Sequence, residues 1–354
     1  MKNIFDYLDF YKDISFKEFV FNEVDALILG VLSYVKFDDI VPRGIKEYIY
    51  LEDAVTYFLE RYCEDDFKKE NWLFPNSYKL MTLLGSSKRF YHTKLYHYNP
   101  SVGEKGQFGS LTIRLTNGIT YVSYEGTDSN VIGWKEDFEL IYKNPIYSQE
   151  MARDYFNETI NFWDRKIIVG GHSKGGNLAM YAYMYGNEKL KKRVKKVYNY
   201  DGPGFLDAVY ESKKYAQMST KLEWIVPKDS VIGMILGNGT YTVVNSSGYG
   251  VLSHDAYTWE CFGGQLVKTE LSKKSRKLET NLKAYIDDMS IEERKNFVET
   301  FFAVFSQAGI SNIMQLKDFK ISTLLQLMKN LTSVPAATKR NLIAVLRMLI
   351  TGMN

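Results

Sequence analysis

The amino-acid sequence predicts an α/β fold with a mainly parallel central sheet, and two observations support this. Between about residues 94 and 244, short β-branched and aromatic runs alternate with amphipathic helical segments, which is typical of parallel strands joined by crossover helices. Helical patterns precede this region, and from about residue 268 the strand-like runs stop. We therefore expect an N-terminal helical segment packed on the core (1–90), an α/β core (91–267) and a C-terminal helical extension (268–354).

The N-terminal segment contains two predicted helices. The run Asn22–Val35 is apolar except for acidic residues at its start. Asn22 can cap this helix, and the acidic residues suit the positive end of its dipole. Asp53–Tyr62 is predicted as a second helix. The aromatic residues of the loop 71–75 are expected to pack as in an ordinary loop, with a flap over a functional site as the alternative.

The predicted core elements follow in order. The expected strands are Lys94–Tyr98, Phe108–Leu115, Ile119–Tyr124, Ile167–Val169, Lys195–Tyr200, Leu222–Val226 and Thr240–Val244. Thr116-Asn117-Gly118 is a hairpin turn between the second and third of these strands. Helices are expected at Ser148–Asp164 and around Phe205–Ala216, with a polar loop before Trp134.

The C-terminal extension is expected to be helical throughout. Ser290-Ile291-Glu292-Glu293 matches a capping box, and a helix with phenylalanines at apolar spacing follows it. Two or three more helices are expected between there and Asn354, with Pro335 separating them. We expect these helices to pack on each other or on the core; a partner or membrane-surface role is the alternative.

Composition and charge exclude several classes of protein. The 354 residues include 45 Lys and Arg against 42 Asp and Glu, so charge gives no case for nucleic-acid binding. The two cysteines, Cys63 and Cys261, lack metal-ligand spacing and form no disulfide framework. No signal peptide or membrane-spanning run is recognisable. These features predict a soluble cytoplasmic protein without a metal site; its oligomeric state stays open.

The motif with the clearest chemical meaning is Gly171-His172-Ser173-Lys174-Gly175. It matches G-x-S-x-G between a predicted strand and a predicted helix, which is the setting of a nucleophilic serine on a sharp turn. Small residues two before and two after the serine let strand and helix approach closely. The motif therefore predicts Ser173 as a nucleophile, with an idle serine in a plain strand–turn–helix as the alternative.

A nucleophilic serine needs a histidine base. In the chain order nucleophile–acid–histidine, His254 is the one histidine that follows Ser173. His172 is adjacent in sequence to Ser173, so their side chains diverge, and we expect it to have a packing role. His92 and His97 come before the nucleophile and are expected to be structural.

Two aspartates compete for the role of orienting the histidine. Asp229 follows the predicted strand Leu222–Val226, and Asp201 follows the preceding strand directly. Both lie at carboxyl ends of strands, where such sites occur. We favour Asp229, because the loop that holds it is free to aim the carboxylate. Asp201 is the alternative, otherwise a turn or pocket residue.

Two backbone amides are candidates for an oxyanion hole. The amide of Lys174 lies at the start of the predicted helix, where an N–H group has no intrahelical partner. The turn Gly126-Thr127-Asp128 follows an earlier strand, and Thr127 offers both an N–H and a hydroxyl. A plain strand-end turn is the alternative for this second segment.

Together these segments resemble the class 3 lipase family of α/β-hydrolases, from about Leu111 to Tyr257. The likeness rests on Gly126-Thr127 with the downstream Trp134 and Asp137, and on Gly171 to Gly176. It is greatest for a bacterial, largely uncharacterised branch with a Ser-Lys-Gly-Gly-Asn segment. The resemblance implies an α/β-hydrolase fold, with Asp229 as the acid, His254 as the base and a side-chain oxyanion donor at Thr127.

Two positions depart from the family pattern. Glu125 stands where lipases usually carry arginine, and Lys174 stands where they usually carry leucine. The lysine is expected to put a charge at the floor or rim of the acyl pocket, so a long-chain triglyceride is not the expected substrate.

The resulting functional hypothesis is an intracellular serine hydrolase that cleaves a carboxylic ester of a small molecule or lipid. It needs no cofactor. Thioesterase or peptidase activity with the same triad is the alternative within enzymes. A catalytically degenerate hydrolase fold that binds a ligand or partner is the alternative outside them.

Overall fold

The computed structural model describes residues 3–70, 76–100 and 106–312. The loop 71–75 and the helices expected after residue 312 lie outside these described residues, so the roles expected for them remain predictions.

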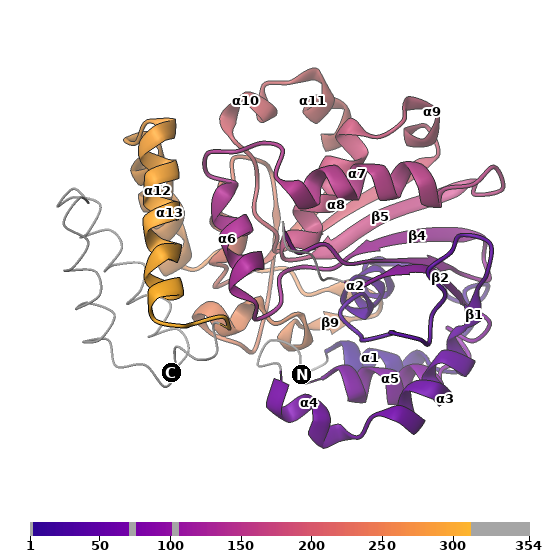
Figure 1. Ribbon diagram of the computed structural model, residues 1–354. Coiled ribbons are helices and arrows are strands. Elements are labelled where there is room, and N and C mark those ends of the chain that lie inside the picture. The colour runs from indigo at the N-terminus through magenta and orange to yellow at the C-terminus, as the bar shows by residue number, and fades with distance from the viewer. Residues whose placement is uncertain (1–2, 71–75, 101–105, 313–354) are drawn as a thin grey trace.

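The core is a single eight-stranded sheet whose strands lie side by side in the order of the sequence (Figure 1). The strands are β1 (Ile49–Tyr50), β2 (Lys94–Asn99), β3 (Ser110–Arg114), β4 (Ile119–Tyr124), β5 (Lys166–His172), β6 (Val194–Tyr200), β7 (Leu222–Pro227) and β8 (Thr242–Val244). β1 to β4 pair antiparallel, and β4 to β8 pair parallel. The predicted α/β class with a mainly parallel sheet is confirmed.

Successive side chains of the central strand β5 point to opposite faces, so helices cover both. Ile168 belongs to the core on the side of α2 (Glu23–Leu32), whereas Ile167 and Val169 belong to the core on the side of α7 (Tyr147–Thr159) and α8 (Lys174–Tyr185). This alternation is the period of two that a strand imposes. The sheet is therefore the middle layer of three (Figure 1).

The helices α7, α8 and α11 (Lys213–Ser219) connect the parallel strands on one face. Three features of this region differ from the sequence prediction. The predicted helix around Phe205–Ala216 is two short helices, α10 (Asp207–Tyr210) and α11, and α9 (Glu188–Lys191) is an extra turn. The predicted polar loop before Trp134 ends at Asn130, which caps α6 (Val131–Glu139) through its side chain.

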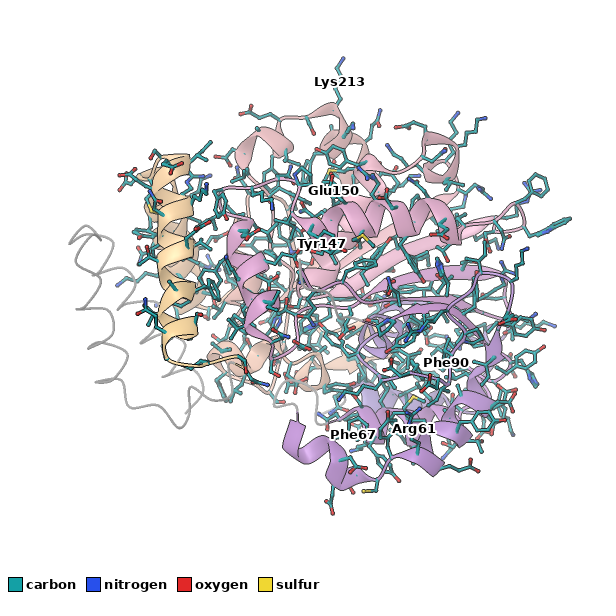
Figure 2. The ribbon with its side chains drawn as sticks, in the orientation of Figure 1. Arg61, Phe67, Phe90, Tyr147, Glu150 and Lys213 are labelled. Carbon is teal, nitrogen blue, oxygen red and sulfur yellow. The ribbon has the colours of Figure 1, made fainter. Side chains whose placement is uncertain are left out.

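The N-terminal helices form the layer on the other face. They are α1 (Ile4–Tyr11), α2, α3 (Leu51–Arg61), α4 (Glu64–Glu70) and α5 (Ser77–Gly85). Asn22 caps α2 as predicted, in a capping box completed by Asp25. The Asp25 carboxylate also accepts from the buried Arg89 guanidinium, with the closest contact at 2.6 Å. Figure 2 shows Phe67 and Phe90 within this layer, and both side chains are buried.

The C-terminal part of the described chain is a helical pair that stands beside α6 (Figure 1). The pair is α12 (Lys273–Asp287) and α13 (Ile291–Gln307), and Ser290 and Glu293 form the predicted capping box of α13. A small two-stranded sheet, β9 (Cys261–Phe262) and β10 (Gln265–Leu266), precedes them. Three 3₁₀ turns, η1 (Ile232–Met234), η2 (Gly250–His254) and η3 (Ala256–Thr258), lie between β7 and β9. Within the described residues, every helix is too short or too polar to cross a bilayer.

Candidate active site

Ser173 sits on a strained turn between β5 and α8. Its backbone has φ 59° and ψ −137°, a region that costs a non-glycine residue free energy and is concentrated at functional sites. A Cβ on Gly175 would lie 2.1 Å from the Tyr124 carbonyl oxygen, and one on Gly171 would lie 2.5 Å from the same atom. Both flanking glycines of the motif are therefore required by close packing of strand β4 against the turn, as the sequence predicted for this type of turn.

His254 lies at the end of η2 and is hydrogen-bonded to a buried carboxylate. Its Nδ1 is 2.6 Å from Asp201 Oδ2. The other oxygen of Asp201 accepts from the Ser230 hydroxyl and, at 3.2 Å, from the Gly233 N–H. Burial raises the pKa of Asp201, while the hydrogen bonds from His254, Ser230 and Gly233 oppose that rise. With Nδ1 engaged, Nε2 is the ring nitrogen that remains for proton transfer.

The favoured choice of Asp229 for this partner is corrected by the geometry. Asp229 lies in the turn after β7, where it is partly exposed, and the carboxylate that meets His254 is that of Asp201. The reason is strand order. β6 is the direct neighbour of β5, with Tyr200 paired to His172, so the residues that follow these two strands emerge next to each other. β7 lies one strand farther from β5.

His172 supports the position of His254 rather than acting as a base. Its Nε2 is 2.7 Å from the His254 carbonyl oxygen. A carbonyl accepts only, so Nε2 carries the hydrogen, and Nδ1 accepts from the Tyr34 hydroxyl at 3.1 Å. Burial lowers the pKa of His172 well below its usual value, and the neighbouring His254 adds to that effect. The packing role expected for His172 agrees with this neutral, fully buried ring, which links the turn after α2 to the loop of His254.

His92 and His97 lie away from Ser173. His92 is exposed and pairs with Glu52 at 2.7 Å. His97 stacks on Tyr155, with ring centroids 4.3 Å apart. Their expected structural roles agree with these positions.

The loop of Thr127 packs directly against the nucleophile turn. A Cβ on Gly126 would lie 2.8 Å from the Ser173 Cβ, so the glycine lets Thr127 follow beside Ser173. Thr127 is buried, and its hydroxyl donates to Asp137 Oδ2 at 2.5 Å. Because that hydroxyl hydrogen is engaged, the backbone N–H is the group of Thr127 that stays available to a ligand. The family resemblance implies that the Thr127 hydroxyl donates to the oxyanion, but in this structure the hydroxyl donates to Asp137.

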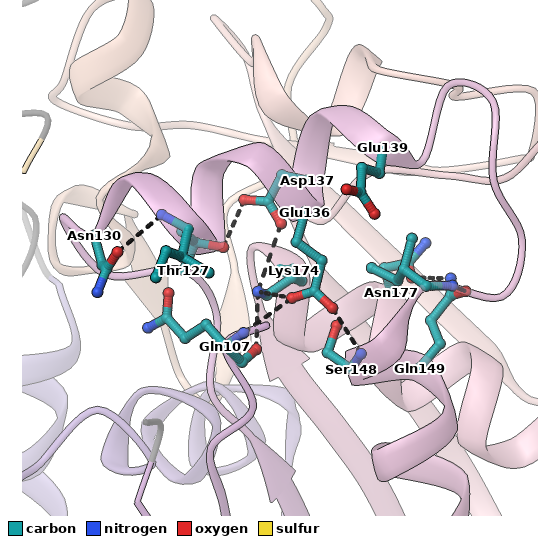
Figure 3. A network of polar contacts seen from close by, with 12 residues as sticks. Gln107, Thr127, Asn130, Glu136, Asp137, Glu139, Ser148, Gln149, Lys174 and Asn177 are labelled. Atoms are coloured by element: carbon teal, nitrogen blue, oxygen red, sulfur yellow. Dashed lines mark hydrogen bonds and ion pairs between the residues drawn. The ribbon is translucent and has the colours of Figure 1, made fainter. Parts of the chain in front are cut away.

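Lys174 belongs to a buried polar network behind the turn (Figure 3). Its Nζ donates to the Gln107 carbonyl oxygen at 2.9 Å and to Glu136 Oε2 at 3.0 Å, and lies 3.8 Å from Asp137 Oδ1. Glu136 also accepts from the N–H groups of Gln107 and Ser148. The ammonium is fully buried and compensated, so the charge expected at the pocket floor or rim does not face the pocket as a free cation.

The other departure from the family pattern, Glu125, is accommodated beside Gly109. A Cβ on Gly109 would lie 2.0 Å from Glu125 Oε2, and the Glu125 N–H donates to the Gly109 carbonyl oxygen at 2.9 Å. Burial raises the pKa of Glu125 well above its usual value. A glycine immediately before the neighbouring strand β3 thus makes room for a glutamate at this position.

A cavity of about 120 Å³ opens at Ser173. Ser173, His254 and Thr127 all line it, and most of the other lining side chains are apolar. Among the described residues, no hydrogen bond joins the Ser173 hydroxyl to the His254 ring. Catalytic hydrogen bonds of this kind are often long without substrate and tighten when it binds. The cavity is thus the place where the candidate nucleophile Ser173, His254 and the candidate oxyanion donors meet.

Several residues of this site carry only weak signals in the sequence. Asp201 could have been found from its position directly after the strand beside β5, had the strand order been known. Glu136 had one indirect signal: a lysine at the buried start of a helix requires a carboxylate partner. Tyr34 and Gln107 carry no signal that we recognise.

Searches of the curated proteins and of the solved structures found no match. A family model described as Mbeg1-like matches residues 84–303, which is more than half of the 354-residue chain and includes Ser173, Asp201 and His254. The chain therefore belongs to the Mbeg1-like family, which is lipase-like.

Proposed function

We propose that this protein is a serine hydrolase that cleaves a carboxylic ester with Ser173, His254 and Asp201. The observation that carries the proposal is the convergence of a strained serine and a carboxylate-bound histidine on one largely apolar cavity. A strained nucleophile turn, an oriented imidazole and a buried acid are the parts that this chemistry needs. Membership in a lipase-like family supports the same class.

The proposed reaction has two halves. The Ser173 Oγ attacks the ester carbonyl carbon while its proton passes to His254 Nε2, and Asp201 stabilises the imidazolium through Nδ1. The N–H groups of Lys174 and Thr127 donate to the oxyanion of the tetrahedral intermediate. The intermediate then expels the alcohol, which takes the proton from His254. Water attacks the acyl-enzyme in the same way and releases the acid and free Ser173.

The proposal is tested with three p-nitrophenyl derivatives of the same acyl group: an oxoester, a thioester and an anilide. Purified protein is expected to hydrolyse the oxoester with an initial burst, because deacylation of an acyl-enzyme is commonly the slower half. A Ser173→Ala preparation, purified in parallel, gives the background rate. Faster turnover of the thioester or anilide would assign the same triad to a thioesterase or peptidase instead. Oxoester turnover equal to the background would contradict the proposal.

A further inference from the structure

We propose that the ester's acyl group is short and apolar, and that the C-terminal helices α12 and α13 limit its length. This assignment rests on the hydrolase function proposed above and adds the substrate class. It also gives the C-terminal helical pair a role at the site.

The size of the cavity restricts the acyl group. Its volume is about 120 Å³. An engineered apolar protein cavity of about 150 Å³ admits benzene, so the cavity at Ser173 has room for an acyl chain of about four to six carbons. A chain of more than twice that length would have to leave the cavity or displace its walls.

Part of the cavity wall comes from the C-terminal helices. Leu282 and Ile286 of α12 and Phe297 of α13 line the cavity together with Ser173 and His254 of the α/β core. Ile235, which follows η1, and Phe138 of α6 add to the apolar lining. A residue that extends inward from α12 therefore shortens the space available to the end of an acyl chain.

The helices that form this wall are attached to the core by specific contacts. Phe138 of α6 stacks on Phe301 of α13, with ring centroids 5.3 Å apart. The Arg294 guanidinium donates to the Ile141 carbonyl oxygen at 3.1 Å, and the Val131 N–H donates to the Ser311 carbonyl oxygen at 3.1 Å. These contacts fix α13 and the residues after it against α6, and the Tyr241 hydroxyl donates to Glu279 of α12 at 3.0 Å. The wall therefore has a defined position relative to Ser173.

The charges at the cavity favour an uncharged acyl end. Lys174 is the lysine in the lining, and its ammonium is committed to Glu136 and the Gln107 carbonyl oxygen. Asp137 is also at the wall, and burial raises its pKa to about 6. A free carboxylate on the acyl group would therefore lose its hydration without gaining a cationic partner, and this costs free energy.

The assignment is tested with p-nitrophenyl acetate, butyrate, hexanoate and decanoate. Wild-type kcat/KM is expected to peak at butyrate or hexanoate. Leu282→Trp fills the cavity and is expected to lower kcat/KM for hexanoate relative to acetate by about tenfold or more, the effect of a few carbons in an apolar pocket. Leu282→Ala enlarges the cavity and is expected to move the peak toward decanoate.

Asn281→Trp and Asn281→Ala are the matched controls, because Asn281 is the neighbouring exposed residue of α12 and does not line the cavity. All variants are also titrated with a small fluorophosphonate, which reports Ser173 reactivity without a long acyl chain. Two results would overturn the chain-length assignment alone, provided that labelling is normal. One is a wild-type kcat/KM that peaks at decanoate. The other is the same dependence of kcat/KM on chain length in Leu282→Trp and Asn281→Trp. Absence of both labelling and hydrolysis in the folded wild-type protein would overturn the proposed function and this assignment together.

Discussion

Asp201→Asn is expected to lower kcat by about 10⁴-fold, the loss seen when the acid of a Ser-His-Asp triad becomes an amide. The substitution preserves the size of the buried side chain but can present an N–H to His254 Nδ1. The ring would then accept at Nδ1 and carry its hydrogen on Nε2, where it cannot take the proton of Ser173. The measurement is steady-state hydrolysis of p-nitrophenyl butyrate, with the thermal unfolding midpoint as a check of the fold.

Asp229→Asn is the matched control for this prediction. The same chemical change in the partly exposed turn after β7 is expected to leave kcat essentially unchanged. Comparison of the two variants shows which aspartate orients His254, a choice that the sequence leaves open. Loss of activity in Asp229→Asn with retention in Asp201→Asn would show that the His254–Asp201 contact is not the one used in turnover.

Lys174→Met is expected to lower the free energy of unfolding by about 3–5 kcal/mol, the usual cost of removing one partner from a buried ion pair. Glu136 is buried and accepts from Lys174 and from two backbone N–H groups. Without the Lys174 ammonium, the Glu136 carboxylate stays buried in a low-dielectric environment and has no cation to pair with. The loss is measured by urea unfolding, followed by circular dichroism.

Two further variants make this prediction specific. Lys143→Met removes an exposed ion pair with Glu139 and is expected to cost less than about 1 kcal/mol. The double variant Lys174→Met/Glu136→Gln removes both charges, so its cost is expected to be smaller than the sum of the single variants. Equal costs for Lys174→Met and Lys143→Met would contradict the buried network described here.

The parts of the fold that local sequence patterns specify were predicted well. The strand–turn–helix around Ser173 follows from the β-branched run, the glycines and the helix-forming segment after them. The hairpin at Thr116-Asn117-Gly118 and the caps at Asn22 and Ser290 follow from turn and capping chemistry. In each case the signal and the structure lie within a few residues of each other.

The parts that depend on how strands are ordered were predicted less well. Asp201 and Asp229 both follow strands, and the choice between them depends on which strand lies beside β5. The network of Lys174 with Glu136 joins residues 38 positions apart, and the wall of the cavity comes from helices more than 100 residues after Ser173. Such contacts arise from tertiary packing, and a single sequence carries little local trace of them.

The central claim is that Ser173 is a nucleophile activated by His254. It is tested most directly by incubating the full chain with a small fluorophosphonate and locating the adduct by mass spectrometry after digestion. We expect one equivalent of label on the peptide that contains Ser173, a strongly slowed reaction in His254→Ala, and no adduct in Ser173→Ala. Folded wild-type protein that remains unmodified, or that carries its adduct on another residue, would contradict the claim.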